Sequence, residues 1–277
     1  MDHEHFSIAI SVYKNDNPEF FDRALESITD LQTIKPDEVV LVVDGPVSDE
    51  INAVINKYAS KYVFNVIRLE TNGGLGNALR LATENAKYDL IARMDSDDVS
   101  VSDRFEQELA LFESDDSLDV VGGDITEFID SEDNIVATRT VPINDTEIKK
   151  YMKKRCAMNH VSVMLKKQSI MNVGGYLDWH YNEDYYLWIR MQLNNAIFGN
   201  TGTPLVNVRV GEDMYRRRGG KKYYESEKGL QKYMLHHHMI SVYRYCMNCF
   251  TRFVVQILVP NKIREWIYKK YARNSIN

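Results

Sequence analysis

The sequence predicts an α/β fold built on a mostly parallel central sheet with helices on both faces. Apolar runs rich in β-branched residues alternate with stretches of helical periodicity through the first half of the chain. These runs end at acidic, Asn or Gly residues, as strands do before a turn. The chain has 277 residues, of which 44% are hydrophobic, so it can bury a full core. Such alternation is typical of parallel strands joined by helical crossovers.

The first two strand and helix units resemble one another. Residues 6–12 form an apolar run that predicts a buried strand, and Pro18 precedes apolar residues at helical spacing up to Leu31. Residues 39–43 predict a second strand, and apolar positions between residues 51 and 58 predict the helix that follows it. The second unit therefore repeats the first.

Further strands follow along the chain. Residues 63–69 predict the third strand, and residues 72–74 form a turn before a helix over residues 75–84. Residues 88–94 predict the fourth strand, and residues 161–165 predict another one in the second half. The first four strands are the ones that we expect to lie parallel.

Each of the first four strands ends in a polar signature. These signatures are Ser11-Val12-Tyr13, Asp44-Gly45, Asn72-Gly73-Gly74 and Asp95-Ser96-Asp97-Asp98. In open α/β sheets, ligands bind outside the carboxyl ends of the strands. We therefore expect a nucleotide pocket where the four segments meet.

The acidic run Asp95-Ser96-Asp97-Asp98 is the most informative of the four. Its three carboxylates repel one another, and a divalent cation with a polyphosphate would offset that repulsion. The alternative is a solvated acidic loop that caps the next helix, because Ser100 and Asp103 have the spacing of a capping box. Taken alone, the run favours neither interpretation.

The Gly-rich turn at residues 73–76 does not match a known phosphate-binding fingerprint. It follows the third strand and lacks the sixth-position glycine of the dinucleotide-binding pattern, and no Gly-Lys-Ser/Thr follows it. A turn that feeds a helix can still contact a phosphate or a sugar. An ordinary tight connection is the alternative.

Composition separates an acidic body from a basic C-terminal extension. The net charge is −6, yet residues 214–277 carry 14 Lys and Arg against three Glu. Three cysteines (Cys156, Cys246 and Cys249) are too few for a disulfide framework and indicate a reducing compartment. The N-terminus shows no secretion signal. The most apolar part of the extension, residues 250–260, is too short to span a membrane.

Together, these segments resemble the nucleotide-sugar signatures of glycosyltransferase family 2, which has the GT-A fold, a Rossmann-like sheet flanked by helices. Gly174-Gly175-Tyr176 and residues 182–190 also resemble the family's Gly-Gly-Tyr element and its Glu-Asp-Tyr-x-Leu-Trp-x-Arg helix. The resemblance covers roughly residues 6–210. It implies a catalytic domain over residues 1–213, with its nucleotide-sugar half ending near residue 100. A helical basic extension follows over residues 214–277.

The resemblance also implies roles on the donor side. Val12 and Tyr13 would line the base pocket, and Asp44 would bond to a uracil or thymine ring. The expected nucleotide-sugar contacts are Val12, Tyr13, Asp44, Asn72, Gly73, Gly74, Asn77, Asp95 and Ser96. Asp97, assisted by Asp95, would coordinate Mg²⁺ or Mn²⁺ that bridges the diphosphate oxygens. The role of Asp98 stays open, with helix capping as its alternative.

On the acceptor side, the resemblance implies that Asp184 is the general base and that Glu183 supports it or binds the acceptor. A carboxylate is needed there because a sugar hydroxyl is a poor nucleophile until its proton is taken. Adjacent helical residues face different sides, so we do not expect both carboxylates to point at one atom. An acidic first helical turn is the alternative. Leu187, Trp188 and Met191 are expected in the core.

Two basic segments follow the resembling part. Arg216 and Arg218, in a Gly-containing basic stretch, would contact the donor diphosphate or a phospholipid-linked acceptor, with a solvated loop as the alternative. From Phe250 onward, apolar and basic residues interleave as at an anionic membrane surface, or as in a helix packed on the catalytic domain. His160 is either an acceptor-side group or a core histidine. Residues 236–238, all His, are expected to be solvated or to face head groups.

Together with this resemblance, the sequence predicts a cytoplasmic glycosyltransferase at the inner face of the inner membrane. It would move a sugar from a nucleotide donor, expected to be a UDP-sugar, to a lipid-linked saccharide. The resemblance further implies inversion at the anomeric carbon and a role in bacterial O-antigen or capsule assembly. A nucleotidyltransferase is the second enzyme hypothesis, but residues 11–15 lack the basic Gly-rich loop that it needs. A silent nucleotide-sugar-binding scaffold is the third hypothesis. Nucleic acid is not an expected partner, because the acidic body would repel its phosphates.

Overall fold

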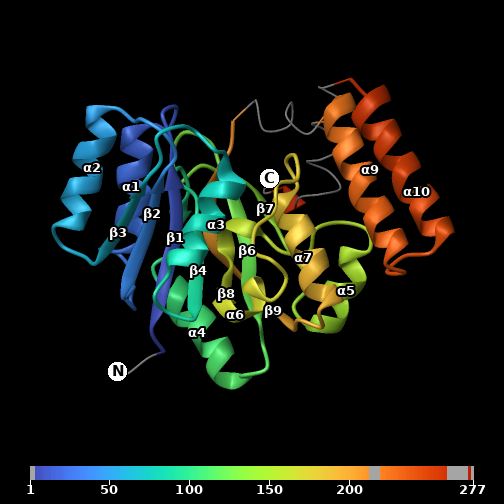
Figure 1. The fold of residues 1–277 in the computed structure, drawn as a ribbon, viewed down its shortest axis with the longest axis horizontal. Coiled ribbons are helices and arrows are strands. Elements are labelled where there is room, and N and C mark those ends of the chain that lie inside the picture. Colours follow the sequence, from blue (N-terminus) through green and yellow to red (C-terminus); the bar gives the residue numbers. More distant parts are fainter. Residues whose placement is uncertain (1–3, 212–218, 261–273, 276–277) are drawn as a thin grey trace.

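A sheet of ten strands forms the centre of the protein in the computed structural model, which describes residues 4–211, 219–260 and 274–275. The strand order is β10-β7-β6-β8-β4-β1-β2-β3, and β9 pairs with both β5 and β6. Helices cover both faces of the sheet, and a hairpin of two helices stands beyond one end of it (Figure 1). The predicted α/β class with helices on both faces is confirmed.

The first half consists of strands and helices in strict alternation. Its elements are β1 (Phe6–Val12), α1 (Pro18–Ile28), β2 (Glu38–Val43), α2 (Asp49–Ala59), β3 (Phe64–Arg68), α3 (Leu75–Asn85) and β4 (Leu90–Met94). β1 pairs in parallel with β2 and β4, and β2 pairs in parallel with β3. All four predicted strands are therefore confirmed as parallel neighbours. Their carboxyl ends meet at one edge of the sheet.

Local chemistry starts the first two helices where the sequence predicts them. The Asn17 side chain accepts hydrogen bonds from the Glu19 and Phe20 amides, and Pro18 occupies the first helical turn, where its missing N–H costs nothing. The Ser48 hydroxyl accepts from the Ile51 amide at the start of α2. These caps end the preceding loops and fix the direction in which each helix leaves the sheet edge.

The second half mixes strand directions. Its elements are β5 (Val99–Ser100), α4 (Arg104–Ser114), β6 (Val120–Phe128), β7 (Ile135–Arg139), α5 (Asp145–Met152), η1 (His160–Ser162), β8 (Met164–Lys166), α6 (Lys167–Met171), α7 (Glu183–Leu193), β9 (Phe198–Arg209) and β10 (Asn274–Ser275). β8 runs antiparallel to β4 and β6, whereas β9 runs parallel to β6. The sheet is thus parallel among the first four strands, and it mixes parallel and antiparallel pairs beyond them.

Two details differ from the sequence predictions. The strand predicted over residues 161–165 begins only at Met164, because residues 160–162 form a single 3₁₀ turn. The capping box that the sequence offered as the alternative is absent: Ser100 lies in β5, where its amide donates to the Ser27 hydroxyl, and Asp103 starts α4 without a side-chain cap. Pairing with β9 holds Ser100 extended and so removes it from the helix start.

The core lies on both faces of the sheet, as alternation along the strands requires. Val40 and Val42 pack with residues of α3 and α7 on one face. Val39 and Leu41 pack with residues of α1, α2 and α4 on the other face. The prediction that Leu187, Trp188 and Met191 belong to the core is confirmed, because all three are fully buried.

The basic extension forms a hairpin made of α9 (Lys221–His236), α10 (Val242–Phe253) and the short π-helix η2 (Val254–Leu258). It packs on the rest of the protein through apolar side chains such as Leu230 and Met234, which are fully buried in the core. Polar contacts add to this packing; for example, the indole Nε1 of Trp179 donates to the Ser226 carbonyl at 3.2 Å. The boundary predicted near residue 213 falls outside the described residues. Within the described parts of the chain, no helix is both long and apolar enough to cross a membrane.

Candidate active site

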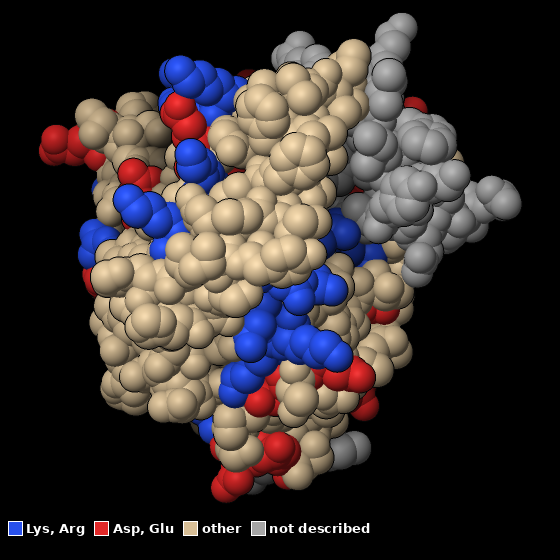
Figure 2. Space-filling view, turned by 90° about the vertical axis from the view of Figure 1, so that its right-hand side faces the viewer, with Lys and Arg blue, Asp and Glu red and all other residues tan. Residues whose placement is uncertain are grey.

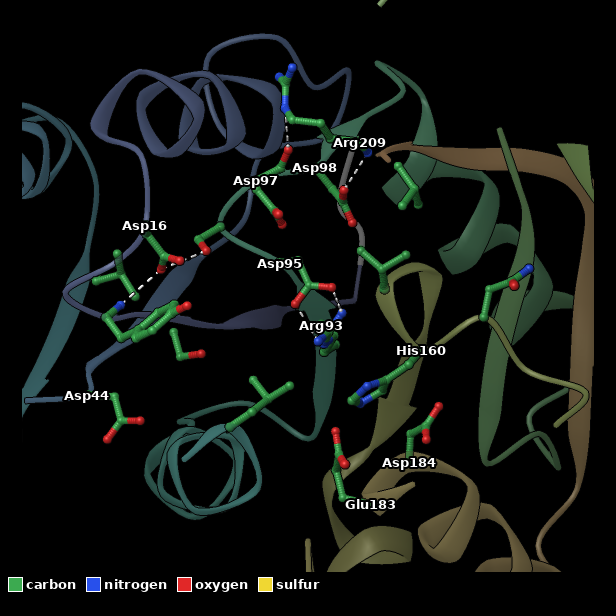
Figure 3. A pocket seen from close by; sticks show the side chains of 18 of the residues that line it. Asp16, Asp44, Arg93, Asp95, Asp97, Asp98, His160, Glu183, Asp184 and Arg209 are labelled. Carbon is green, nitrogen blue, oxygen red and sulfur yellow. Dashed lines mark hydrogen bonds and ion pairs between the residues drawn. The ribbon is translucent and has the colours of Figure 1, made fainter. Parts of the chain in front are cut away.

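A pocket of about 630 Å³ opens at the carboxyl ends of β1, β2 and β4 (Figure 3). The first half of the chain contributes the polar strand ends, and the second half contributes groups from β7, η1, α7 and β9. The polar and aromatic side chains that line it include Tyr13, Asp16, Asp44, Asn72, Arg93, Asp95, Ser96, Asp97, Asp98, Arg139, His160, Glu183, Asp184 and Arg209. Both halves of the predicted site therefore meet in one cavity.

Asp44 organises the turn at residues 72–74. Its carboxylate accepts hydrogen bonds from the Gly73 amide at 2.6 Å, the Gly74 amide at 3.0 Å and the Asn72 side-chain amide at 2.9 Å. Gly45 must be glycine, because its φ is +88° and an added Cβ would lie 2.9 Å from the Asn72 amide nitrogen. The turn is therefore fixed beside the pocket by a buried carboxylate.

The other predicted donor-side residues lie around this turn. Val12, Tyr13, Asn72 and Gly74 line the pocket. Gly73 and Asn77 are not among the lining residues: Gly73 lies against the Asn77 side chain, whose oxygen accepts from Arg80 at 3.0 Å. The eleven-residue helix α3 begins at the pocket, so the positive end of its dipole favours an anion there.

Arg93 holds Asp95 in place. The Arg93 side chain is buried in β4, and its two terminal nitrogens donate to the two carboxylate oxygens of Asp95. A bidentate pair of this kind fixes the orientation of the carboxylate as well as its charge. Our sequence interpretation did not single out Arg93. The sequence does contain a signal for Arg93, because a charged residue interrupts an otherwise apolar strand there.

Asp97 and Asp98 are crowded carboxylates, of which Asp98 is buried and Asp97 stays partly exposed at the pocket. Burial, then the charges of Asp95 and Asp16, raise the pKa of Asp97 to about 6. Burial, then Asp95 and Asp97, raise the pKa of Asp98 well above its usual range. Asp98 is 3% exposed and accepts a hydrogen bond from the Arg209 amide at 2.8 Å. Helix capping is therefore not its role; it ties the acidic loop to the end of β9.

Two further residues complete this wall, and our sequence interpretation missed both. Asp16 accepts from the Ser96 hydroxyl and from the Tyr13 amide, each at 2.9 Å, and burial raises its pKa. The Arg209 guanidinium lies over the Phe20 ring, 3.7 Å from its centroid, and donates to the Asp97 carbonyl at 3.2 Å. Asp16 is thus a fourth carboxylate beside the predicted three.

The wall suits a divalent cation that shares its ligands with a substrate. Within the described residues, no group of three or more His, Cys, Asp or Glu side chains could hold a metal ion unaided. Both Asp95 oxygens accept from Arg93, which favours Asp97 as the protein ligand. A cation would also relieve the repulsion that raises the pKa of Asp97 and Asp98. Phosphate oxygens and water would supply the remaining ligands.

Glu183 and Asp184 form the opposite wall, at the start of α7. Both line the pocket, and both point from the helix toward the space below Arg93 and His160 (Figure 3). Burial, followed by the charge of Asp184, raises the pKa of Glu183 to about 7. The two adjacent side chains thus reach one cavity. That they do not point at one atom stays a prediction.

His160 has partners in the protein and also faces the pocket, so it fits both alternatives that the sequence left open. Its Nε2 lies 2.8 Å from the Tyr176 hydroxyl, and its ring packs edge-on against Trp188. Burial, together with the charge of Arg93, lowers the pKa of His160 well below its usual range, so the ring is neutral at physiological pH. It is thus a partnered histidine that also lines the pocket.

The cations of the pocket are not the ones that the sequence singled out. Arg216 and Arg218 lie outside the described residues. Among the described residues, Arg93, Arg139 and Arg209 line the pocket. Arg139 donates to the Cys156 carbonyl at 2.8 Å, and the Cys156 thiol lies 3.9 Å from Asp184, so Arg139 belongs to the acceptor-side wall.

Comparison with known proteins agrees with this geometry. The model of the family described as Glycosyl transferase family 2 matches residues 7–175. An uncharacterized glycosyltransferase of Haemophilus influenzae is 39% identical over 82% of this chain and 84% of its own length. The amylovoran biosynthesis glycosyltransferase AmsE of Erwinia amylovora is 32% identical, over 96% of this chain and 98% of its own.

A third relative is named for its reaction. The Escherichia coli UDP-Gal:alpha-D-GlcNAc-diphosphoundecaprenol beta-1,3-galactosyltransferase is 35% identical over 97% of this chain and 96% of its own. Among solved structures, residues 1–349 of S. aureus TarS match with a TM-score of 0.66 at 18% identity, covering 95% of this chain and 78% of that one. The TarS likeness shows the GT-A-like fold, and the family match with these relatives shows that the chain belongs to glycosyltransferase family 2.

Proposed function

We propose that this glycosyltransferase moves a sugar from a UDP-sugar to a saccharide carried on a lipid diphosphate, in the assembly of a bacterial surface polysaccharide. The observation that carries the proposal is the single pocket whose one wall holds Asp95, Asp97 and Asp98 and whose other wall holds Glu183 and Asp184. The name of the Escherichia coli relative, with its UDP-galactose donor and undecaprenol-linked acceptor, supports both substrate classes. The amylovoran relative supports the pathway class.

On the donor side, the protein binds the nucleotide and neutralises its leaving group. The turn held by Asp44 and the N-terminus of α3 lie near the diphosphate, and Val12 and Tyr13 lie near the base. Asp97 would hold Mg²⁺ or Mn²⁺, which when bound neutralises the charge that develops on the leaving diphosphate. Arg93 keeps Asp95 oriented beside it, toward the ribose side of the nucleotide.

On the acceptor side, Asp184 removes the proton. The acceptor hydroxyl oxygen attacks the anomeric carbon, the bond from that carbon to the diphosphate breaks, and the hydroxyl proton passes to the Asp184 carboxylate. A single displacement inverts the anomeric configuration. Glu183, whose pKa of about 7 leaves it partly protonated at neutral pH, can donate a hydrogen bond to an acceptor oxygen at the same time.

The basic extension places the enzyme at its acceptor. A lipid-linked saccharide stays at the membrane, so an enzyme that uses it gains from residence at the cytoplasmic face of the inner membrane. Residues 262–273 alternate apolar and basic side chains as interfacial segments do, and they lie outside the described residues. Peripheral binding to anionic lipid is therefore part of the proposal.

A donor screen tests the proposed reaction against its alternatives. The full-length protein is incubated with Mn²⁺, an undecaprenyl-diphosphate-linked sugar and each member of a panel of nucleotide sugars. Release of UDP with a new glycosidic bond is the expected result. Release of pyrophosphate from UTP and a sugar phosphate would instead indicate a nucleotidyltransferase. Donor binding in calorimetry without turnover for any pair would indicate a binding scaffold.

A further inference from the structure

The helix α10 turns its polar side inward. Asn248 donates to the Gln231 side chain at 2.7 Å and to the Lys153 carbonyl at 2.9 Å. Arg252 forms an ion pair with Glu227 and donates to the Lys154 carbonyl at 2.8 Å. These contacts tie the polar side of the helix to α9 and to the segment after α5. Tyr245, which packs on the core, and Phe253, which packs on the Tyr224 ring of α9, add to that attachment.

The apolar side of the same helix faces outward. Six of the 14 large apolar side chains exposed among the described residues lie on α10 and η2. They are Val242 at 66% exposure, Tyr243 at 75%, Met247 at 45%, Phe250 at 65%, Phe253 at 38% and Leu258 at 61%. Tyr243, Met247 and Phe250 recur at helical spacing, so they form one continuous stripe. An exposed stripe of this size marks an interaction surface. We call these six residues the α10 stripe.

The surroundings of the stripe are basic. The sequence has no Asp or Glu between Val242 and Leu258. Exposed lysines lie at positions 221, 222, 228 and 232 on the neighbouring helix α9 and at 153 and 154, whose carbonyls accept from α10, whereas Glu225 is the exposed acid of α9. In the space-filling view of this side, an uncharged band is bordered by Lys and Arg (Figure 2). Most acidic side chains in that view lie toward the lower and left edges.

We infer that the α10 stripe is a membrane-docking face, which lies in the plane of an anionic bilayer with its apolar side chains among the acyl chains and the flanking lysines at the head groups. An apolar face with a cationic border complements such a surface. A second copy of the chain fits less well, because a two-fold contact through the stripe would bring two basic borders together. The biological purpose of this docking face rests on the proposed function, because it depends on the lipid-linked acceptor. The geometry of the face does not depend on that proposal.

The test compares matched variants of the full-length protein in vesicle sedimentation. Vesicles contain phosphatidylethanolamine with phosphatidylglycerol, or neutral phosphatidylcholine alone. The double variant Met247→Glu, Phe250→Glu should lower the fraction bound to anionic vesicles at least tenfold. Val63→Glu is the control, because Val63 is 67% exposed but lies before β3, away from the hairpin. It should bind as the unaltered protein does. Thermal unfolding of both variants verifies that they are folded.

Three outcomes would overturn the inference. The first is binding of the double variant at the level of the unaltered protein. The second is equal binding to neutral and anionic vesicles, since the basic border would then play no part. The third is a dimer of the unaltered protein that the double variant abolishes while vesicle binding persists, which would assign the stripe to a second copy.

Catalytic activity separates this inference from the proposed function. Slow hydrolysis of the UDP-sugar, measured without vesicles as UDP release, should be equal in the unaltered protein and the double variant, because the α10 stripe lies outside the pocket. Absent hydrolysis in both, combined with the expected loss of vesicle binding, would refute the proposed function and leave the docking face in place. Hydrolysis lost only in the double variant would contradict the inference, since the stripe would then act on the site itself.

Discussion

The two walls of the pocket hold their carboxylates in different ways. The donor wall consists of Asp44, Asp95, Asp97 and Asp98, and hydrogen-bond partners fix three of these acids. Three donors hold Asp44, Arg93 donates to both oxygens of Asp95, and the β9 backbone donates to Asp98. On the acceptor wall, Glu183 stands at a helix start with its pKa raised to about 7 by burial and by Asp184. Burial and crowding also raise the pKa of Asp97 and Asp98 on the donor wall, and a bound cation would keep those carboxylates ionised. Without such a cation, the raised proton affinity of Glu183 suits an acid or base that changes its protonation state.

The largest expected effect is on the acceptor wall. Replacing Asp184 by Asn removes the proposed proton acceptor with little change in shape, so transfer should fall about a thousandfold. Donor affinity, measured by calorimetry with UDP, should stay nearly the same. Asp178→Asn, an exposed change a few residues earlier, is the matched control. If the Asp184 variant kept its transfer activity, another residue would be the general base. The two walls would then not have the separate roles proposed for them.

The next effect tests the donor wall. Asp97→Asn should lower transfer about a hundredfold or more, because the leaving diphosphate loses its electrostatic stabilisation. The remaining activity should respond weakly to Mn²⁺, whereas chelation should abolish activity of the unaltered protein. The exposed Asp133→Asn serves as the control. Full turnover in the presence of a chelator would contradict the metal role of Asp97.

The free energy of unfolding distinguishes a carboxylate that pairs with a buried cation from a carboxylate on the surface. Asp95→Ala leaves the buried Arg93 guanidinium without its ion-pair partner, which should lower the free energy of unfolding by about 3 kcal/mol. Glu84→Ala breaks the half-exposed pair with Arg80 and should cost about 0.5 kcal/mol. Urea unfolding of both variants measures the difference. Equal losses would mean that Arg93 does not depend on Asp95.

Local pattern explains what the sequence predicted well. The first four strands and their helices follow from apolar periodicity and from caps such as Asn17, which act within a few residues. The acidic run was found for the same reason, because its carboxylates are adjacent in sequence. The predicted direction of the sheet was right only where helices connect successive strands, since antiparallel pairs such as β6 and β8 leave no such local signal.

Long-range contacts explain what was missed. Arg209 lies 111 residues from Asp98, and no local pattern announces that its amide will hold that carboxylate. Asp16 stands in a polar loop that reads as a turn until Ser96 is placed beside it. The inward polar side of α10 is equally invisible in sequence, because an amphipathic helix is expected to bury its apolar face. In each case, the contact depends on a partner that lies far away in the sequence.

The smallest expected effect concerns the pH dependence of stability. The folded protein holds the Glu183 proton up to a pKa of about 7, whereas the ordinary value is 4.5. The native state therefore binds more protons than the unfolded chain between those values. This contribution favours folding at the low end of that window, declines as the pH rises to 7, and then stays level. Glu183→Gln should remove this decline. From pH 5 to pH 8, the free energy of unfolding of the variant should therefore rise by about 1 to 2 kcal/mol relative to that of the unaltered protein.

Urea unfolding at the two pH values measures that gain as a difference between proteins. The difference is needed because Asp97, with a pKa of about 6, and Glu108, with a pKa of about 7, add declines of the same sign to both proteins. The exposed Glu113→Gln is the control and should shift stability equally at both pH values. A pH-independent effect of Glu183→Gln would show that its carboxyl titrates normally. The raised pKa of Glu183 would then no longer distinguish the acceptor wall. Only the proposed proton transfer to Asp184 would still separate the two walls.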